Sequence, residues 1–157
     1  MKKVILGATG SIGSSLAKKL VESGEQVHLV GRDETSLSEL ANELDSTFTT
    51  CDVLEENFSE KIINDLKDEQ VNGLAYCVGS IDLKPLKLTK KSDFMQSFNL
   101  NLVSATEIIK SLADNLKASK GSIVLFSTVA VQQGFPNHAI VSSAKGAVEG
   151  LTLALAA

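Results

Sequence analysis

Apolar and polar positions along this chain fall into two alternating patterns. Short runs of apolar residues are typical of buried strands, and apolar residues at every third or fourth position are typical of helices packed on one face. The predicted strands cover Val4–Leu6, Gln26–Val30, Thr47–Cys51, Val71–Val78 and Ile123–Phe126. The predicted helices cover Ser14–Glu22, Glu34–Leu44, Glu55–Lys67, Ser92–Leu116 and Asn137–Ala157.

The order of these elements predicts an α/β fold. Strand and helix alternate throughout, and right-handed crossovers would place the strands in one doubly wound parallel sheet with helices on both faces (Rossmann fold). Residues 71–78 are almost all apolar or small, as expected for a strand buried on both faces. Because no linker or repeat interrupts the pattern, we expect a single dinucleotide-binding domain over residues 1–157.

A glycine-rich turn directly follows the first predicted strand. Gly7, Gly10 and Gly13 lie three residues apart, and a helix is predicted behind them. Such a turn aims backbone N–H groups and the positive end of the helix dipole at one point, and glycine lets a pyrophosphate come close. The alternative is an ordinary tight turn. We interpret it as a dinucleotide site, formed by Gly7, Thr9, Gly10, Ser11, Ile12 and Gly13.

The end of the second strand bears on the identity of the dinucleotide. An acidic residue there would hold the ribose hydroxyls of NAD, whereas an arginine would pair with the 2′-phosphate of NADP. Arg32 stands at this position, and Asp33 is expected to start the following turn or to cap the following helix. The sequence therefore favours NADP. NAD remains the alternative if Arg32 is only a surface residue.

Composition limits the partners and the compartment. The 157 residues carry a net charge of −4, which argues against nucleic acid or an anionic membrane as the main partner. Cys51 and Cys77 match no metal spacing and are expected to be free thiols in a reducing compartment. No segment is expected to reach transmembrane length, and no signal peptide follows Met1. We expect a cytoplasmic protein without a metal site.

These motifs, in this order, resemble those of the short-chain dehydrogenase/reductase family. The glycine turn stands where the family has TGxxxGxG, although Ser11 takes the place of the middle glycine. Asp52 and Val53 resemble the pair that contacts adenine, and Gly79 is the one residue that matches the NNAG motif after the fourth strand. The resemblance covers residues 3–157 and implies a nicotinamide cofactor.

The resemblance also implies the catalytic positions. Asn101 matches the family's structural or catalytic asparagine, and Thr128 stands at the catalytic serine and keeps its hydroxyl. The family's Tyr-x-x-x-Lys pair uses the tyrosine as proton donor and the lysine to bind the nicotinamide ribose. Here Lys145 is present, but Val141 replaces the tyrosine at the family's spacing from Thr128. The chain therefore resembles a divergent branch that lacks the catalytic tyrosine.

His138 is our candidate for the missing proton donor. On a helix, His138, Val141 and Lys145 share one stripe, and an imidazole can act as a general acid near neutral pH. Asn137 is expected to cap that helix. The alternative is a histidine that is solvated or bonded to the loop. Tyr76 is the only tyrosine and is expected to pack in the core.

The family continues beyond the point that Ala157 matches, with at least one more strand, a Pro-Gly loop over the nicotinamide and a substrate lid. In the family, helices matching 92–116 and 137–157 pair across a subunit interface, so the resemblance implies a homo-oligomer, either a dimer or a tetramer. The alternative is that further chain covers their apolar stripes.

Three functions fit these residues. The first is an NADP(H)-dependent oxidoreductase that transfers a hydride between the nicotinamide and a small carbonyl or alcohol substrate. The second is a non-catalytic NAD(P)-binding protein, a sensor or inactive subunit, because Val141 has no proton to give. The third is epimerisation through transient use of the nicotinamide. The inventory of candidate site residues favours the first function.

Overall fold

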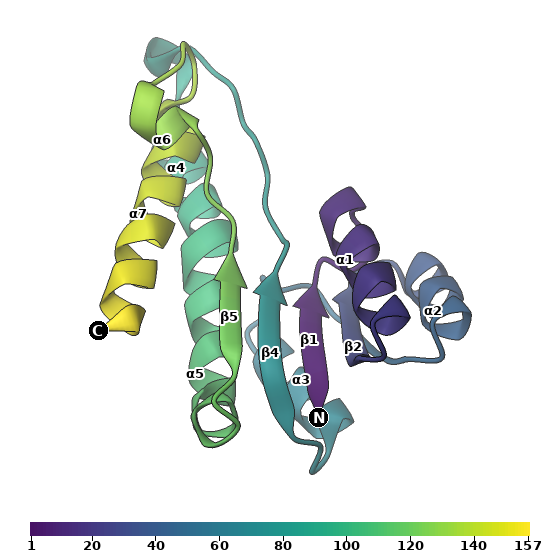
Figure 1. The fold of residues 1–157 in the computed structure, drawn as a ribbon. Helices are drawn as coiled ribbons and strands as arrows, with labels where there is room; N and C mark the ends of the chain where they lie inside the picture. Colours follow the sequence, from purple (N-terminus) through teal and green to yellow (C-terminus); the bar gives the residue numbers. More distant parts are fainter. The chain divides into compact units, whose positions relative to one another are not determined.

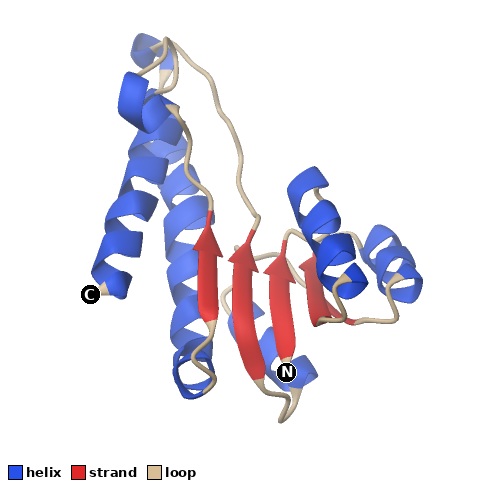
Figure 2. Cartoon of the chain, in the orientation of Figure 1, coloured by secondary structure: helices blue, strands red, loops and turns tan.

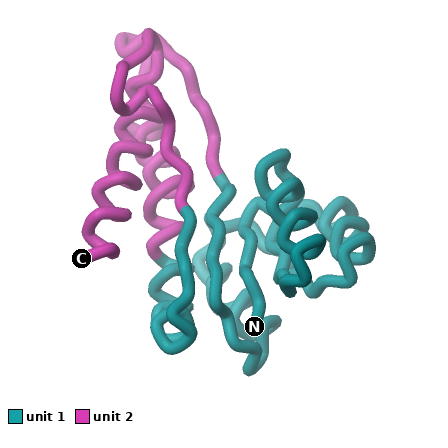
Figure 3. The backbone as a smooth tube through the Cα atoms, viewed as in Figure 1, with its two compact units in different colours: residues 1–78, 107–124 teal, residues 79–106, 125–157 magenta.

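The computed structural model describes residues 1–157, which form two compact units. Unit 1 comprises Met1–Val78 and Glu107–Val124, and unit 2 comprises Gly79–Thr106 and Leu125–Ala157 (Figure 3). Each unit carries some of the predicted site residues.

Unit 1 is built around a parallel sheet in the strand order β3-β2-β1-β4-β5 (Figures 1 and 2). The strands are β1 (Lys2–Leu6), β2 (Gln26–Gly31), β3 (Thr47–Thr50), β4 (Val71–Tyr76) and β5 (Ser122–Leu125). The reversal of strand order at β1 is the doubly wound arrangement expected from the alternating pattern. The predicted fold class is therefore confirmed.

Helices cover both faces of this sheet, and the core lies between the layers (Figure 2). The helices α1 (Ser11–Glu22) and α2 (Glu34–Glu43) pack on one face, and the other face carries α3 (Phe58–Leu66) and the unit 1 part of α5 (Ser104–Ala118). Each fully buried Leu or Ile in these layers contributes about 1.5–3 kcal/mol. The largest fully buried side chains include Ile5, Leu6, Leu29, Leu37, Ile62, Ile108 and Leu112.

A buried histidine interrupts this apolar core. His28 in β2 is fully buried, and its two ring nitrogens lie 2.8 Å and 2.9 Å from the hydroxyls of Thr47 and Thr49. Thr49 donates in turn to Asp65 (2.6 Å). Burial, reinforced by the nearby Lys2 ammonium, lowers the pKa of His28 to about 4. His28 is therefore neutral at physiological pH and satisfied by its hydroxyl neighbours.

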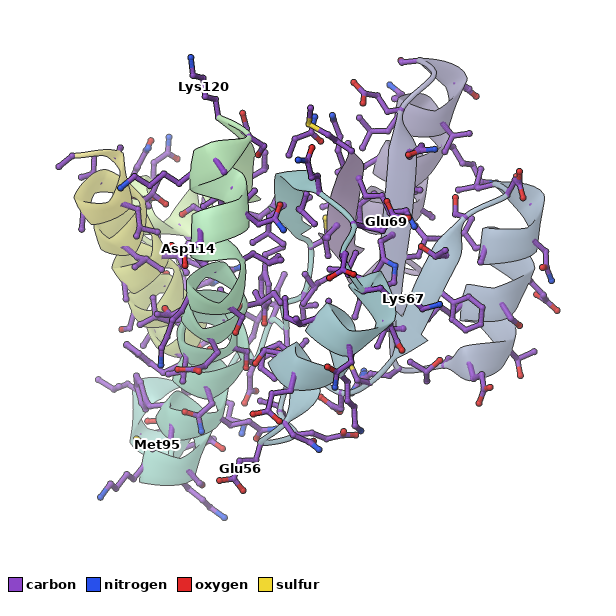
Figure 4. The ribbon with its side chains drawn as sticks, turned by 90° about the horizontal axis from the view of Figure 1, so that it is seen from below. Glu56, Lys67, Glu69, Met95, Asp114 and Lys120 are labelled. Carbon is purple, nitrogen blue, oxygen red and sulfur yellow. The ribbon has the colours of Figure 1, made fainter.

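Two further predictions about unit 1 side chains are confirmed. Tyr76 is buried, and both cysteines are free thiols. Burial raises the pKa of Cys51 and of Cys77 to about 11, so neither thiol is a ready nucleophile. The Lys2 ammonium, at the start of the central strand β1, pairs with Glu69, which lies between α3 and β4 (Figure 4).

Unit 2 is helical. It contains η1 (Leu86–Leu88), α4 (Lys91–Phe98), η2 (Asn99–Val103), the first residues of α5, α6 (Ala130–Gln133) and α7 (Ala139–Ala156). The residues expected to form one long helix at 92–116 do run continuously, but η2 is a π-helical turn within them. The helix α7 packs against α4 and η2.

The start of α7 differs from the prediction. Asn137 was expected to cap this helix, but it has a φ of 65°, in the left-handed region, and the N-cap position is taken by His138. Asparagine adopts this conformation more readily than most residues, so it ends the preceding turn instead. The prediction for Asn137 was therefore wrong, and His138 lies just outside the helix.

The apolar character of α7 also departs from expectation. By length and composition alone, residues 139–156 would be long and apolar enough to cross a membrane, so the expectation that no segment reaches that length was wrong. The packed side of the helix is formed by Ile140, Val141, Ala144 and Val148. A stripe of this kind is also typical of the core helix of a globular domain.

Candidate functional site

The glycine turn between β1 and α1 is closed so tightly that side chains would not fit. Gly7 has a φ of 74°, and a Cβ on it would lie 3.0 Å from the Cys77 carbonyl. A Cβ on Gly13 would lie 2.2 Å from the Gly7 carbonyl oxygen, well inside contact distance. Gly10, whose N–H donates to the same oxygen (3.0 Å), is less restricted. The turn therefore requires glycine at positions 7 and 13.

The turn presents the N-terminus of α1 without a protein cap. Gly10 is the N-cap residue and has no side chain to accept from the first N–H groups, and the first turn of α1 holds no acidic residue. These N–H groups belong to Ser11, Ile12 and Gly13, which have no acceptor within the helix. An anion is the partner that such a helix end favours. The turn is thus suited to a phosphate group.

The ends of β2 and β3 carry the next predicted residues. Asp33 caps α2, because its carboxylate accepts from the Ser36 N–H (2.8 Å). Hydrogen bonding by the Ser36 side chain, and then by its backbone N–H, lowers the pKa of Asp33. Arg32 is 76% exposed and lies 3.4 Å from a carboxylate oxygen of Asp52. The guanidinium is therefore held near the strand ends by a weak surface pair.

Asp52 and Val53 follow β3 and differ in exposure. The other carboxylate oxygen of Asp52 accepts from the Leu54 N–H (3.0 Å), which fixes the start of the connection to α3. Val53 is buried beside it. Thr9, in the glycine turn, places its hydroxyl near Gly31 at the end of β2. Both strand ends thus border the same edge of unit 1.

A hollow of about 380 Å³ opens elsewhere in unit 1. It is lined largely by apolar residues of β1, β4, β5 and α1, with Lys3 and Lys120 among the polar exceptions. No predicted site residue lines this hollow. It therefore adds nothing to the candidate site.

The second group of predicted residues lies in unit 2, around Gly79. A Cβ on Gly79 would lie 3.1 Å from Asn101 Oδ1 and 3.4 Å from Lys145 Nζ. The glycine thus leaves a small space flanked by an amide oxygen and an amino group. Desolvation by burial lowers the pKa of Lys145. These three residues were predicted separately, and the structure brings them together.

Asn101 is held in place while its oxygen stays unpaired. Its side chain is 1% exposed, and Nδ2 donates to the carbonyl (2.9 Å) and hydroxyl (3.3 Å) of Ser97. Oδ1 is buried and has no hydrogen-bond partner. A buried acceptor of this kind costs free energy unless a ligand or water satisfies it. The unpaired oxygen therefore marks a point where a bound group would fit.

The π-helical turn η2 sets the position of Asn101, and sequence reasoning missed it. A π turn adds one residue to a helical turn, and such turns occur frequently at functional sites. Ser104 Oγ donates to the Asn99 carbonyl (2.9 Å), five residues back. A serine placed to bond a carbonyl of the wider turn is a weak sequence signal, since serines also bond within ordinary helices.

Thr128 follows β5, with its hydroxyl oriented by the backbone. Its Oγ1 accepts from the Ala130 N–H (3.3 Å), so the hydroxyl hydrogen remains available to a ligand. A hydroxyl arranged in this way is suited to donate to a carbonyl oxygen.

His138 is bonded to its own loop, as the alternative interpretation expected. Its Nδ1 lies 2.7 Å from the Pro136 carbonyl oxygen, and the Phe135 ring lies beside it. A carbonyl only accepts, so Nδ1 carries the proton and Nε2 is the nitrogen left for a ligand. Val141 is buried and adds no polar group. His138 thus keeps one nitrogen for proton transfer.

The comparisons with known proteins agree with this architecture. A sequence model for the family described as short chain dehydrogenase matches residues 2–157. The chain therefore belongs to the short-chain dehydrogenase/reductase family. This confirms the resemblance seen in the sequence motifs.

Two relatives illustrate the similarity and its extent. The chain is 31% identical to an L-fucose dehydrogenase from Oryctolagus cuniculus over 157 residues, which cover 98% of this chain and 55% of that protein. It is 29% identical to an L-xylulose reductase from Bos taurus, over 99% of this chain and 64% of that protein. The chain thus spans less than two thirds of the length of these relatives.

Solved structures share the fold at lower identity. A short-chain dehydrogenase/reductase from Vibrio parahaemolyticus superposes with a TM-score of 0.86 at 24% identity, over 99% of this chain and 73% of that one. One from Saccharomyces cerevisiae superposes with a TM-score of 0.91 at 18% identity, over 99% and 64%. These likenesses establish the fold.

Proposed function

We propose that this protein is an NADP(H)-dependent oxidoreductase that transfers a hydride between the nicotinamide and a small carbonyl or alcohol substrate. The observation that carries the proposal is the space at Gly79, where the buried, unpaired Asn101 oxygen and the Lys145 amino group face the same point. The names of the relatives, a dehydrogenase and a reductase of sugars, support the same class of reaction and a substrate rich in hydroxyls.

Each unit offers residues that fit one part of a dinucleotide. The glycine turn of unit 1 is closed too tightly for a Cβ on Gly13, and its uncapped N–H groups at the start of α1 suit the pyrophosphate. Lys145 and Asn101 suit a ribose, because one donates and the other accepts. The bound nicotinamide would supply the hydride. Arg32, which is exposed and held only by a long contact to Asp52, supports NADP over NAD.

Three side chains would handle the substrate oxygen and its proton. The Thr128 hydroxyl, whose oxygen already accepts from Ala130, would donate to the substrate oxygen. The free Nε2 of His138 would move the proton, as base in alcohol oxidation and as acid in carbonyl reduction. Lys145, with a pKa below its usual range, would hold the ribose and support that transfer.

A homo-oligomer is part of this proposal. Leu153 and Leu155 on α7 are apolar side chains that are 75% and 50% exposed. The family resemblance implies that this helix packs against a second copy of the protein, which would cover exposed apolar side chains.

A non-catalytic NAD(P)-binding protein is the second candidate. The buried, apolar Val141 favours it, because no proton donor stands at that position. The two candidates make the same prediction for cofactor binding and opposite predictions for turnover.

Turnover with the His138→Ala variant tests the choice between them. The protein is assayed with NADPH against a panel of ketoses and small ketones, and with NADP⁺ against the matching alcohols, by following nicotinamide absorbance. We expect turnover that falls about 100-fold in His138→Ala with unchanged NADPH affinity. The control is Gln133→Ala, which changes an exposed residue at the end of α6. Equal turnover in wild type and variant would remove His138 from the mechanism, and no turnover at all would favour the non-catalytic candidate.

A further inference from the structure

Two hydrogen bonds tie α7 to the segment that follows β5. Ser127 Oγ donates to a carboxylate oxygen of Glu149 (2.5 Å), and Ser142 Oγ donates to the Ala130 carbonyl (3.2 Å). Along the segment, these bonds lie on either side of Thr128. Along the helix, they lie on either side of Lys145.

The spacing along α7 places both bonds on the face that carries Lys145. Ser142 lies three residues before Lys145 and Glu149 lies four residues after it, and such positions are neighbours on one helix face. The two attachment points are about 10 Å apart along the helix axis. One bond would let the helix pivot about a point, whereas two bonds at this separation also fix its direction.

The bond between Ser142 and Ala130 is connected to the Thr128 side chain through Ala130 alone. The Ala130 N–H donates to Thr128 Oγ1 (3.3 Å), while the carbonyl of the same residue accepts from Ser142. Ala130 is buried, so water does not compete freely for its two backbone groups. The hydroxyl of Thr128 is thereby oriented by the same residue that anchors the helix.

The second bond, between Ser127 and Glu149, is charge-assisted, because a hydroxyl donates to a carboxylate. Nothing in the proposed chemistry uses Ser127, Ser142 or Glu149 directly. Their shared property is that they connect the two elements that carry Thr128 and Lys145.

We propose that Ser127, Ser142 and Glu149 are positioning residues, which form a two-point clamp that holds Lys145 at a fixed place relative to the Thr128 hydroxyl. The catalytic consequence of the clamp rests on the proposed function. The clamp itself is a property of the protein without cofactor, and its test is made there.

The test measures the reactivity of Lys145 in the cofactor-free protein. Trace labelling with acetic anhydride across a pH series, read by peptide mass spectrometry, gives the pKa and accessibility of each lysine. Burial holds the pKa of Lys145 below its usual range. If the clamp holds the helix in place, Ser142→Ala, Glu149→Ala and their double variant bring the pKa of Lys145 closer to that of a solvated lysine and raise its labelling.

Matched variants separate the clamp from general effects on the helix. Ser143 donates to the Ala139 carbonyl within α7 (2.7 Å), so Ser143→Ala removes a serine hydroxyl without touching the clamp. Glu149→Gln keeps an oxygen that accepts from Ser127. Both variants are expected to label Lys145 as the wild type does. The lysines of α5, Lys110 and Lys117, are internal references.

The outcome that overturns the clamp is unchanged Lys145 labelling in Ser142→Ala and Glu149→Ala. Equal effects of Glu149→Gln and Glu149→Ala would overturn the assignment of Glu149 as an acceptor. If the double variant unfolds by circular dichroism, the single variants and Glu149→Gln decide the question.

A titration of the same variants connects the clamp to the cofactor. We expect Ser142→Ala and Glu149→Ala to weaken NADPH about tenfold. Binding of adenosine 2′,5′-bisphosphate, which lacks the nicotinamide ribose, should not change. Equal NADPH affinity in all variants would contradict the clamp's role in binding. Failure of the wild type to bind NADPH would contradict the proposed function instead and would leave the labelling result intact.

Discussion

The proposed site depends on small or apolar residues at positions where a larger or more polar side chain would change the chemistry. Gly13 lets the backbone of the turn close to a distance that excludes a Cβ, Gly79 leaves a small space beside Asn101 and Lys145, and Val141 removes the usual proton donor. The sequence alone indicated all three, because motif spacing identifies a position even where the residue departs from the motif. The bond of His138 to its own loop was one of the interpretations that the sequence offered, because its partner is only two residues away. The unpaired oxygen of Asn101 could not be read from the sequence, since it depends on neighbours supplied by the fold.

The Gly13→Ala variant tests whether the backbone of the glycine turn is as tightly packed as the structure shows. Its Cβ would lie 2.2 Å from the Gly7 carbonyl oxygen, so the turn has to open. We expect a loss of about 1–3 kcal/mol in the free energy of unfolding, measured in urea, together with loss of NADPH binding. The control is Gly150→Ala, where nothing lies within 4 Å and alanine should stabilise α7 by about 0.5–1 kcal/mol. Normal NADPH affinity in Gly13→Ala would contradict the assignment.

His28 makes the stability of unit 1 depend on pH. Its pKa is about 4 in the folded chain against 6.5 for a solvated histidine, so between these values the unfolded chain binds more protons. The contribution is fully present above pH 6.5 and is lost as the pH falls toward 4, by about 3 kcal/mol in all. Urea unfolding across this range should show the slope in the wild type and in His138→Ala. His28→Asn should flatten it, and an equal slope in His28→Asn would refute the assignment.

Whole strands and helices were the most predictable elements. Each predicted strand and helix has a counterpart, because blocks of apolar residues have few other ways to be buried. The local geometry was less predictable. The π turn at Asn99–Val103 and the left-handed Asn137 arise where the backbone follows tertiary contacts, and neither changes the apolar pattern. The sequence therefore located the helices that carry Asn101 and Lys145, and the structure supplied their relative placement.

Gly79→Ala tests the space between η2 and α7. Its Cβ would lie 3.1 Å from Asn101 Oδ1, closer than most such contacts, so the amide or Lys145 has to move. We expect NADPH to bind about tenfold more weakly, with little change in the unfolding transition. Gly146→Ala is the matched control in α7, because its Cβ would meet only an ordinary contact with Val131 at 3.7 Å. The same NADPH affinity in Gly79→Ala as in this control would argue against a ligand at this space.

At the scale of the whole molecule, the predicted residues fall into two groups. The turn at Gly7–Gly13, Arg32 and Asp52 belong to unit 1, and Gly79, Asn101, Thr128, His138 and Lys145 belong to unit 2. The doubly wound fold was predictable because the alternation of strand and helix leaves one common architecture. Substrate choice was not predictable, because Thr128 and His138 would act on the reacting oxygen, which carbonyl and alcohol substrates have in common.

The proposed homo-oligomer would form through the exposed apolar side chains near the end of α7. We expect sedimentation velocity to detect a dimer or tetramer, and Leu153→Glu with Leu155→Glu to shift it toward the monomer, because the charges would be buried at the interface. Ile81→Glu, at a residue that is also exposed but lies outside α7, is the control. A wild type that sediments as a monomer would contradict the prediction.

The central claim is that the chain binds NADPH through the glycine turn and Arg32. The most direct measurement is a calorimetric titration of the protein with NADPH and with NADH, repeated with Arg32→Ala. We predict micromolar binding of NADPH, weaker binding of NADH, and loss of that preference in Arg32→Ala, because the guanidinium is the proposed partner of the 2′-phosphate. Absence of binding by either nucleotide, or a preference that survives in Arg32→Ala, would contradict the claim.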